Sequence, residues 1–484
     1  MKTLSILSLL VLTYMQGFSQ WQPDVRLTID PYNSYTTVNN AWCVAASGND
    51  VHVVCYDDRD TNNEIYYKRS TDGGISWGSD IRLTTNSADS KNPSVSVSGS
   101  VVHVVWEDGR DGNFEIYYKR STDGGISWGL DTRLTTNSEV SFYPSVSVSG
   151  SVVHVVWRDT RDGNYEIYYK RSADGGITWD FDARLTSNSA VSYLPSVSAS
   201  GSVVHVVWYD NREGNDEIYY KRSADGGITW GSDARLTSDP SVSGYPSVSV
   251  SGSVVHVVWR DYRDGNFEIY YKRSTDGGVS WGSDTRLTSN SAVSDLPSVS
   301  VSGSVVHLVW RDDRDGNQEI YYKRSIDGGI SWSSDTRLTS NSSVKLYSSV
   351  SVSDSVVHVA WTDTRDGNYE IYYKRNPTGN IVGVKIISSE IPEEFSLSQN
   401  YPNPFNPGTN IKFTIPKSGL VTLKVYDVLG NEIATLVDEY KPVGSYEVKF
   451  DVGQDSSPDI ASGIYFYKVQ AGNYIEMKKM VLIK

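Results

Sequence analysis

A period of 51 residues runs through most of the chain and limits what it can fold into. Six tryptophans and all seven histidines recur at this step, and Cys55 takes the tryptophan position in the first unit. The repeated residues are Trp106, Trp157, Trp208, Trp259, Trp310 and Trp361, with His52, His103, His154, His205, His256, His307 and His358. The chain therefore contains seven units, and a period of this length is typical of solenoids, propellers and arrays.

The composition of one unit predicts four short antiparallel strands. From Pro93 it reads PSVSVSGSVVHVVWEDGRDGNFEIYYKRSTDGGISWGLDTRLTTNS. PSVSVS, VVHVVW, EIYYKRS and the RLT segment are the expected strands, and SGS, DGN and DGG supply the turns. A linear solenoid needs distinct polar caps at its ends, and the N-terminus shows none. We therefore predict an all-β, seven-bladed β-propeller.

The tail of the repeat also stands near the start of the chain. Residues 21–30 read WQPDVRLTID, whereas the seventh unit (348–375) is followed by NPTGN in place of the box and lacks its own RLT segment. We predict that the N-terminal strand completes the last blade and closes the ring, which removes an exposed strand edge. The alternative is a local fourth strand from IVGVKIIS (381–388).

The third turn of each unit has the form Ser-x-Asp-x-Gly-x-x-Trp, as in STDGGISW at 121–128. Six such turns over residues 20–376 resemble the Asp-box, or BNR repeat, of sialidase-like propellers. We expect the box residues to be structural, with the aspartate accepting backbone N–H bonds and the tryptophan packing between sheets. They are Asp72, Asp123, Asp174, Asp225, Asp276 and Asp327, with Trp77, Trp128, Trp179, Trp230, Trp281 and Trp332.

Both ends of the chain indicate export. Residues 1–19 have the charged start, short apolar run and small residues of a secretory signal, so we expect the mature chain to begin at Gln20. After a linker at 377–394, residues 395–484 predict a small immunoglobulin-like β-sandwich. This segment resembles the C-terminal sorting domain of type IX secretion substrates. The resemblance implies the type IX machinery as a partner, removal of the domain in many cases, and a protein secreted or attached to the outer surface of a Gram-negative bacterium.

Charge and cysteine content narrow the function further. A formal net charge of −14 without a basic block makes nucleic acid a poor partner, and no segment is apolar enough for a transmembrane span.

Cys43 and Cys55 flank a predicted hairpin turn, and export permits a disulfide between them. We predict that bridge.

Two repeated polar patterns have structural explanations. In Asp159-Thr160-Arg161-Asp162-Gly163-Asn164 the arginine can neutralise the carboxylates, so we expect a salt-bridged turn; a Ca²⁺ site is the alternative. The histidines stand among valines on separate blades, which favours buried core residues over metal ligands. We expect no metal and no cofactor.

An enzyme and a binding protein differ in what they require of the blades. The resemblance to sialidases implies an arginine triad, a Tyr–Glu nucleophile pair and an acid from non-equivalent blades, but the period admits no insertion and the units are nearly equal. We therefore expect no catalytic residue; a divergent sialidase-like glycoside hydrolase and a purely structural surface protein remain as alternatives.

Strand alternation places the SGS turns and Asp-boxes on one face, the box face, and the remaining loops on the opposite one, the variable face. Variable Tyr and Arg side chains on the second face predict recognition of carbohydrate or another surface polymer. The predicted binding residues are Arg158, Tyr193, Tyr209, Tyr245, Arg260 and Arg311.

Overall fold

The computed structural model describes ten segments of the chain. They are residues 21–37, 42–354, 356–379, 385–388, 392, 394–417, 419–441, 443–451, 461–472 and 474–483. The predicted signal segment lies outside them. The chain divides at about residue 380 into two compact units, and the ordered elements of both are β-strands. The described part of the chain holds no helix with the length and apolar character to cross a membrane.

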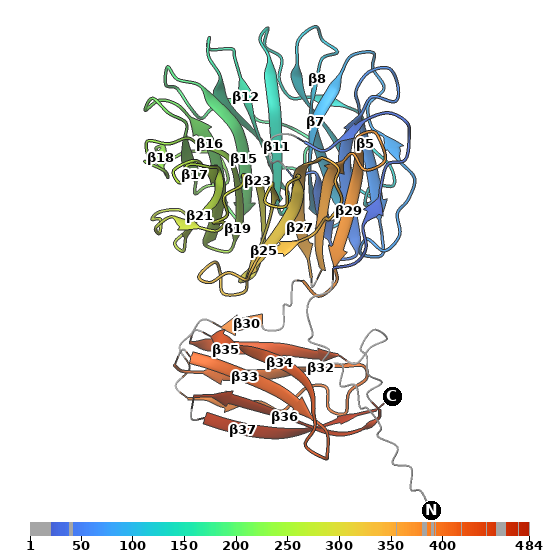
Figure 1. The fold of residues 1–484 in the computed structure, drawn as a ribbon, viewed down its shortest axis with the longest axis vertical. Coiled ribbons are helices and arrows are strands. Elements are labelled where there is room, and N and C mark those ends of the chain that lie inside the picture. Colours follow the sequence, from blue (N-terminus) through green and yellow to red (C-terminus); the bar gives the residue numbers. More distant parts are fainter. Residues whose placement is uncertain are drawn as a thin grey trace, which may run out of the picture. The chain divides into compact units, whose positions relative to one another are not determined.

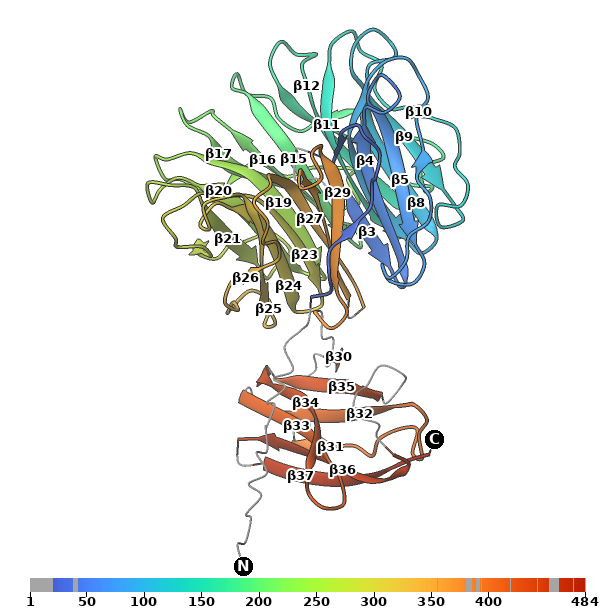
Figure 2. The ribbon, with the colours of Figure 1, turned by 45° about the vertical axis from the view of Figure 1, so that its right-hand side comes forward.

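The first unit confirms the predicted propeller architecture, and its described residues form seven antiparallel sheets (Figures 1 and 2). We number these sheets as blades in chain order, each with strands one to four from the axis outwards. Blade 1 contains β2 (Ser34–Tyr35), β3 (Val44–Ser47), β4 (Asp50–Asp57), β5 (Glu64–Ser70) and β6 (Ile81–Arg82). Blade 2 contains β7 (Ser90–Ser98), β8 (Val101–Asp108), β9 (Glu115–Ser121) and β10 (Thr132–Arg133). Blade 3 contains β11 (Ser141–Ser149), β12 (Val152–Asp159), β13 (Glu166–Ser172) and β14 (Ala183–Arg184).

The later blades repeat this order. Blade 4 contains β15 (Ser192–Ser200), β16 (Val203–Asp210), β17 (Glu217–Ser223) and β18 (Ala234–Arg235). Blade 5 contains β19 (Ser243–Ser251), β20 (Val254–Asp261), β21 (Glu268–Ser274) and β22 (Thr285–Arg286). Blade 6 contains β23 (Ser294–Ser302), β24 (Val305–Asp312), β25 (Glu319–Ser325) and β26 (Thr336–Arg337). Blade 7 contains β27 (Lys345–Ser353), β28 (Val356–Asp363), β29 (Glu370–Asn376) and β1 (Val25–Arg26).

The N-terminal strand closes the ring, as predicted. β1 pairs with β29 through Val25↔Tyr373 and Arg26↔Tyr372. The two residues that follow β1 are also integrated, since Leu27 and Thr28 are buried and Thr28 Oγ1 accepts a hydrogen bond from Ile371 N at 2.8 Å. The innermost strand of blade 1, β3, lies between those of blades 7 and 2. The ring is therefore continuous across the first and last blades.

The predicted disulfide is wrong, because the hairpin of blade 1 has a different register from the one assumed. Both thiols are free and buried. The pair Ser47↔Asp50 and the bond from Val54 N to Cys43 O (2.9 Å) place Cys43 opposite Val54 rather than Cys55. Since neighbouring residues of a strand point to opposite sides of a sheet, this one-residue offset separates the two sulfurs across the pleat.

Alkylation tests the state of the thiols. Burial raises the pKa of the Cys43 thiol to about 12 and also raises that of Cys55. Because the thiolate is the reactive form, we expect no alkylation of the native protein near pH 8 and modification of both cysteines after denaturation without a reductant. If mass spectrometry detects modification only after reduction, the two cysteines are bridged.

The second unit is the predicted β-sandwich. One sheet has the order β30 (Lys385–Ser388), β35 (Gly444–Asp451), β32 (Gly408–Ile415) and β31 (Ser396–Leu397). The other has the order β34 (Glu432–Lys441), β33 (Gly419–Tyr426), β36 (Gly463–Ala471) and β37 (Tyr474–Leu482). Phe413, Leu423, Tyr446 and Tyr467 contribute to the apolar core of this unit.

One predicted boundary needs correction. Residues 377–394 were expected to form a linker, and 381–388 the alternative fourth strand of blade 7. Instead β30, which lies in this stretch, pairs with β35 of the sandwich through Lys385↔Glu447 and Ile386↔Tyr446. The strand belongs to the second unit, because β1 already occupies the edge of blade 7.

Candidate functional site

The Asp-box turns are held by hydrogen bonds to their aspartates. Asp123 accepts bonds from Ser127 Oγ (2.5 Å), Ser127 N (2.9 Å) and Ile126 N (3.1 Å). These bonds lower the pKa of the Asp123 carboxyl, and the bond from the Ser127 hydroxyl contributes most. Equivalent bonds from the third and fourth following residues form at the other five box aspartates, Asp72, Asp174, Asp225, Asp276 and Asp327. All six therefore have partners within their own turns.

The box tryptophans join neighbouring blades. Trp179 of blade 3 packs edge-on against Tyr118 of blade 2, with ring centroids 4.9 Å apart. The same contact recurs for Trp77, Trp128, Trp230, Trp281 and Trp332 with the preceding blade's tyrosine. Trp21, which precedes β1, makes it with Tyr322 of blade 6. N-terminal closure thus reproduces the inter-blade contact even though blade 7 lacks a box.

The same tyrosines explain the histidine of each unit and the second glycine of each box. Tyr118 Oη lies 2.8 Å from His103 Nδ1. On the other side it approaches Gly176 so closely that an added Cβ would stand 1.9 Å from the hydroxyl oxygen. All the repeated histidines are buried, with side chains no more than 1% exposed. They form part of the core, as predicted.

Two adjacent glycines give a matched test of this contact. Gly175 and Gly176 have φ of +73° and +86°, so alanine is strained at both, but only at Gly176 does the Cβ clash with Tyr118. We expect Gly175→Ala to cost about 1–2 kcal/mol from backbone strain alone and Gly176→Ala about 2 kcal/mol more from overpacking. Urea unfolding of both variants measures the difference. If both substitutions cost the same free energy of unfolding, the contact with Tyr118 does not explain why residue 176 is glycine.

The Asp-Arg-Asp loops are salt-bridged turns, as predicted. Arg161 contacts Asp159 (2.6 Å) and Asp182 (2.6 Å), and its guanidinium lies over the ring of Tyr168 at 4.3 Å. Asp159 also accepts a bond from Trp157 Nε1 (2.9 Å). No group of three His, Cys, Asp or Glu within the described segments is arranged to hold a metal ion. Protein donors thus occupy the carboxylates on which the Ca²⁺ alternative depended.

Four positions on the variable face differ from blade to blade. They are the second residue of strand one, the residue before the strand-two aspartate, the residue after it, and the residue before strand three. Alternation along the strands brings them to one side of each blade. From blade 2 to blade 6 they are Lys91, Glu107, Gly109, Phe114; Phe142, Arg158, Thr160, Tyr165; Tyr193, Tyr209, Asn211, Asp216; Gly244, Arg260, Tyr262, Phe267; and Asp295, Arg311, Asp313, Gln318. The uniform scaffold therefore carries a different set of side chains on each of these blades.

Arg158 is surrounded by aromatic rings. Its guanidinium carbon lies 4.3 Å from the ring centroid of Tyr165, 4.5 Å from Tyr143 and 5.3 Å from Tyr193 of blade 4. In the described part of the chain it has neither a hydrogen bond nor an ion pair, and Nε is buried without an acceptor. Cation–π contacts hold the group in place, and they leave its hydrogen-bond donors available.

Arg260 and Arg311 share one carboxylate. Arg260 Nη1 and Arg311 Nη2 lie 3.2 Å and 2.9 Å from Asp295 Oδ2. Their side chains are only 22% and 16% exposed, and that of Asp295 is 7% exposed. Arg260 also stacks over Tyr245 at 4.2 Å. Both arginines were predicted as exposed recognition residues; they are instead mostly buried parts of an inter-blade ion pair.

Tyr245 belongs to a set of residues on β-bulges at the start of strand one. The pairing register between strands one and two shifts at this point in blades 2, 3, 4, 5 and 7, for example between Phe142 and Ser145. The bulged residue has positive φ. From blade 2 to blade 7 the residues with positive φ at this position are Asn92, Tyr143, Leu194, Tyr245, Leu296 and Tyr347, with φ of 45–53°. Such conformations are uncommon for residues with side chains and are often found where a side chain is re-aimed.

Three tyrosines occupy equivalent bulges in alternate blades. Burial raises the pKa of Tyr347, and its electrostatic interactions with Tyr245 and Tyr143 add to the shift. Burial likewise raises the pKa of Tyr143, with contributions from Glu107 and Tyr245. Strand one is the innermost strand of each blade, so these equivalent positions of blades 3, 5 and 7 lie around the axis at one level. Tyr143, Tyr245 and Tyr347 form what we call the axial tyrosine set.

Glu107 holds one member of this set. It is buried, accepts a bond from Asn92 Nδ2 at 2.8 Å and one from the backbone N of Tyr143 at 2.9 Å. Burial raises the pKa of its carboxyl. Glu107 therefore positions the Tyr143 bulge of the next blade and is unlike any residue at the same position in the other blades.

The six residues predicted for binding are connected in the structure. Tyr193 stacks on Tyr209 (5.2 Å), Tyr209 stacks on Tyr245 (6.2 Å), and Arg158 and Arg260 lie at the two ends of this row. Sequence reasoning missed Tyr143, Tyr347 and Asp295. A signal existed for the first two, since tyrosine precedes the start of the alternating segment at 143, 245 and 347, in every second unit.

Comparison with known families agrees with this geometry. The BNR repeat-like domain matches residues 9–257, slightly more than half of the chain. The chain belongs to the BNR repeat-like family. In this BNR-repeat propeller, residues 399–484 match the secretion system C-terminal sorting domain. That domain indicates export by the type IX machinery, and hence a secreted or surface-attached protein.

Several solved structures resemble the BNR-repeat propeller. Polysaccharide lyase Uly1 is 10% identical, with 74% of this chain and 99% of that chain covered and a TM-score of 0.49. A sialidase from Trypanosoma rangeli is 14% identical (83% and 85% covered, TM-score 0.43), and an α-L-arabinofuranosidase from Fusarium graminearum is 15% identical (57% and 89%, 0.43). At these scores the likenesses carry no argument about activity. No curated protein matches the chain.

Proposed function

We propose that the protein is a non-enzymatic binding propeller whose variable face recognises carbohydrate or another surface polymer outside a Gram-negative cell. One observation supports this most: three tyrosines occupy strained bulges at equivalent positions of the innermost strands, and arginines of the same face are held by aromatic stacking. Backbone strain of this kind persists where the surrounding structure imposes it, often at functional sites.

The chemistry of this surface suits sugars. Aromatic rings offer apolar faces, and phenol and guanidinium groups offer hydrogen bonds to hydroxyls or carboxylates. Arg158 supplies donors that no described residue accepts, and the three axial tyrosines occupy equivalent positions of alternate blades around the axis. Binding through several blades also permits useful avidity on a polymer.

Affinity electrophoresis tests the proposal. We expect gels containing laminarin, xylan, polygalacturonate or alginate to retard the protein for at least one of these polymers. Arg158→Ala should weaken that retardation about tenfold or more, as for a central interface residue. Because the substitution also removes cation–π contacts and a positive charge that acts on buried Glu107, its melting temperature is measured too, and binding is compared where both proteins are folded.

The control lies on the opposite face. Ile177 is 64% exposed in an Asp-box, and Ile177→Ala should alter neither binding nor stability. Arg260→Ala and Arg311→Ala are less suitable variants, because each weakens the compensation of buried Asp295 and should lower stability. If no polymer is retarded, a purely structural role is favoured. If only the Ile177 variant loses binding, the protein binds through the box face and the proposed face is wrong.

Glu107 gives the enzyme alternative a specific candidate. It is a non-repeated, buried carboxyl with a raised pKa beside a tyrosine of the same face, and perturbed carboxyls of this kind occur in active sites. A sialidase-like glycoside hydrolase should release reducing sugar from a retarded polymer, and Glu107→Gln should abolish that release. We expect no release.

A further inference from the structure

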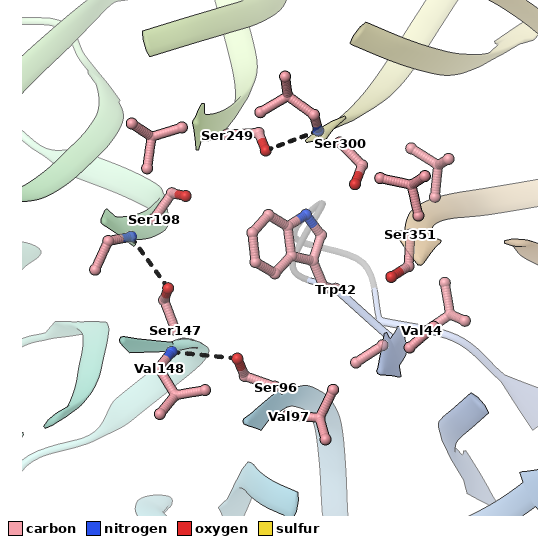
Figure 3. Close-up of a pocket in the computed structure, with 17 residues that line it drawn as sticks. Trp42, Val44, Ser96, Val97, Ser147, Val148, Ser198, Ser249, Ser300 and Ser351 are labelled. Atoms are coloured by element: carbon pink, nitrogen blue, oxygen red, sulfur yellow. Dashed lines mark hydrogen bonds between the residues drawn. The ribbon is translucent and has the colours of Figure 1, made fainter. Parts of the chain in front are cut away.

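The centre of the propeller contains a channel of about 190 Å³. Serines and small apolar residues from strand one of every blade line it. Ser96, Ser147, Ser198, Ser249, Ser300 and Ser351 supply the hydroxyls (Figure 3). Several of these oxygens accept a backbone N–H from the next blade, as in Val148 N to Ser96 Oγ at 3.2 Å. The wall is therefore built uniformly by the repeat.

Trp42 is the exception in this wall. It stands one 51-residue step before Pro93, so it occupies the position that is proline in blades 2–6 and Ser348 in blade 7. In Figure 3 its indole lies at the centre of the serine ring, with its broad face towards the viewer. The side chain is half-buried, and Nε1 is buried without a partner among the described residues.

Trp42 lies at the end of the channel that is nearer to the variable face. In blades 3, 5 and 7 the residue at its position directly follows a member of the axial tyrosine set, Tyr143, Tyr245 or Tyr347. These tyrosines start strand one at its variable-face end, whereas the channel lining extends from there towards the SGS turns. Trp42 thus obstructs the channel at the end where the axial tyrosine set lies.

We propose that Trp42 is the floor of the ligand site, on which one sugar ring stacks while the axial tyrosines contact its edge. This inference rests on the proposed function and specifies how the ligand binds. Sugar rings present C–H groups on their flat faces, and an indole supplies a large, rigid apolar surface with little loss of side-chain entropy. Nothing in the scaffold requires a tryptophan there, because five other blades use proline.

The closed floor also determines which part of a polymer fits. A polymer crossing the face cannot reach an obstructed axis with an internal residue unless it bends sharply, whereas a chain end can enter directly. We therefore infer that the site recognises the terminal residue of a glycan chain. Partial hydrolysis of a bound polysaccharide at constant mass should then increase its potency as a competitor, because the number of ends rises.

Fluorine NMR of the full chain tests the stacking directly. In protein labelled with 5-fluorotryptophan, the Trp42 resonance is assigned by its absence in Trp42→Phe. Titration with whichever of laminarin, xylan, polygalacturonate or alginate retards the protein should shift this resonance more than those of the six box tryptophans. Trp42→Leu should reduce affinity about tenfold or more, and Trp42→Phe should retain part of it.

The outcomes separate the two proposals. Retardation by a polymer without a shift of the Trp42 resonance overturns the floor while the proposed function stands. A shift that is accompanied by weaker competition after hydrolysis overturns end recognition. Absence of retardation by every polymer contradicts both. Because the shift is measured on the wild-type protein, the stacking test does not depend on the stability of Trp42→Leu.

Discussion

Deletion of residues 21–30 is expected to destabilise the propeller by about 5 kcal/mol or more, a large fraction of the stability of an ordinary domain. The segment supplies the fourth strand of blade 7, and burial of Leu27 alone contributes about 2 kcal/mol. The deletion also removes the ion pairs that Asp24 forms with Arg365 (2.6 Å) and Lys374 (2.9 Å). Urea unfolding monitored by circular dichroism measures the effect, and the exposed edge of β29 should promote aggregation.

A matched pair of point variants shows whether this strand is as firmly held as an internal one. Leu27 in blade 7 and Leu185 in blade 3 occupy equivalent positions and are 2% and 3% exposed. Leu→Ala at a site of this kind costs about 2–5 kcal/mol. We expect the two costs to agree within about 1 kcal/mol. A much smaller cost at Leu27 would mean that the closing strand frays, and the deletion should then have little effect.

The fold was predictable because each blade repeats the same local signals. Turn residues, alternation and the 51-residue period agree in every unit, and the missing RLT segment of the seventh unit points to the N-terminal strand that replaces it. Register was harder to predict. The hairpin of blade 1 turns through Gly48 and Asn49 alone, with Gly48 at φ +57°, and this two-residue turn fixes Cys43 one position away from Cys55.

The binding face was only partly predictable, because it depends on contacts between blades. Variation among units identified Arg158, Tyr209 and Tyr245, but no local pattern shows that Arg260 and Arg311 meet at Asp295. The bulges are a second reason. They interrupt the strand at Tyr143 and Tyr347, so simple strand alternation does not tell on which side these side chains lie. The position of Trp42 on the axis depends on the complete ring of blades, so the local sequence does not predict it.

Acidification should unfold the propeller over a narrow pH range. Burial lowers the pKa of His52, His103, His154 and His205 to about 4 and that of His256 and His358 to about 3. In the unfolded chain a histidine titrates near pKa ~6.5. Between these values the unfolded state binds more protons than the folded state, so stability falls as pH falls from about 6.5 towards 4.

The effect is large because it is repeated in six blades. Each histidine changes the free energy of unfolding by about 1.4 kcal/mol per pH unit in this window, so six together give about 8 kcal/mol per unit. A stability of about 5–15 kcal/mol would then be exhausted near pH ~5, roughly one to two units below the onset. Burial raises the pKa of the Asp30, Glu107, Asp216 and Asp313 carboxyls, which opposes the trend, but these are four groups against six.

Proton uptake distinguishes this mechanism from general acid sensitivity. Calorimetric unfolding at pH ~6, where the protein is still folded, in buffers of different ionisation enthalpy should report about four to five protons bound per chain. His154→Gln should lower stability at pH 7, because it disturbs the contact with Tyr169 (2.8 Å), yet reduce the uptake by about one proton. The box aspartates, whose pKa values are lowered by their turns, contribute only at lower pH. An unfolding free energy that is the same at pH 7 and pH 5 would show that the histidines are not held neutral in the core.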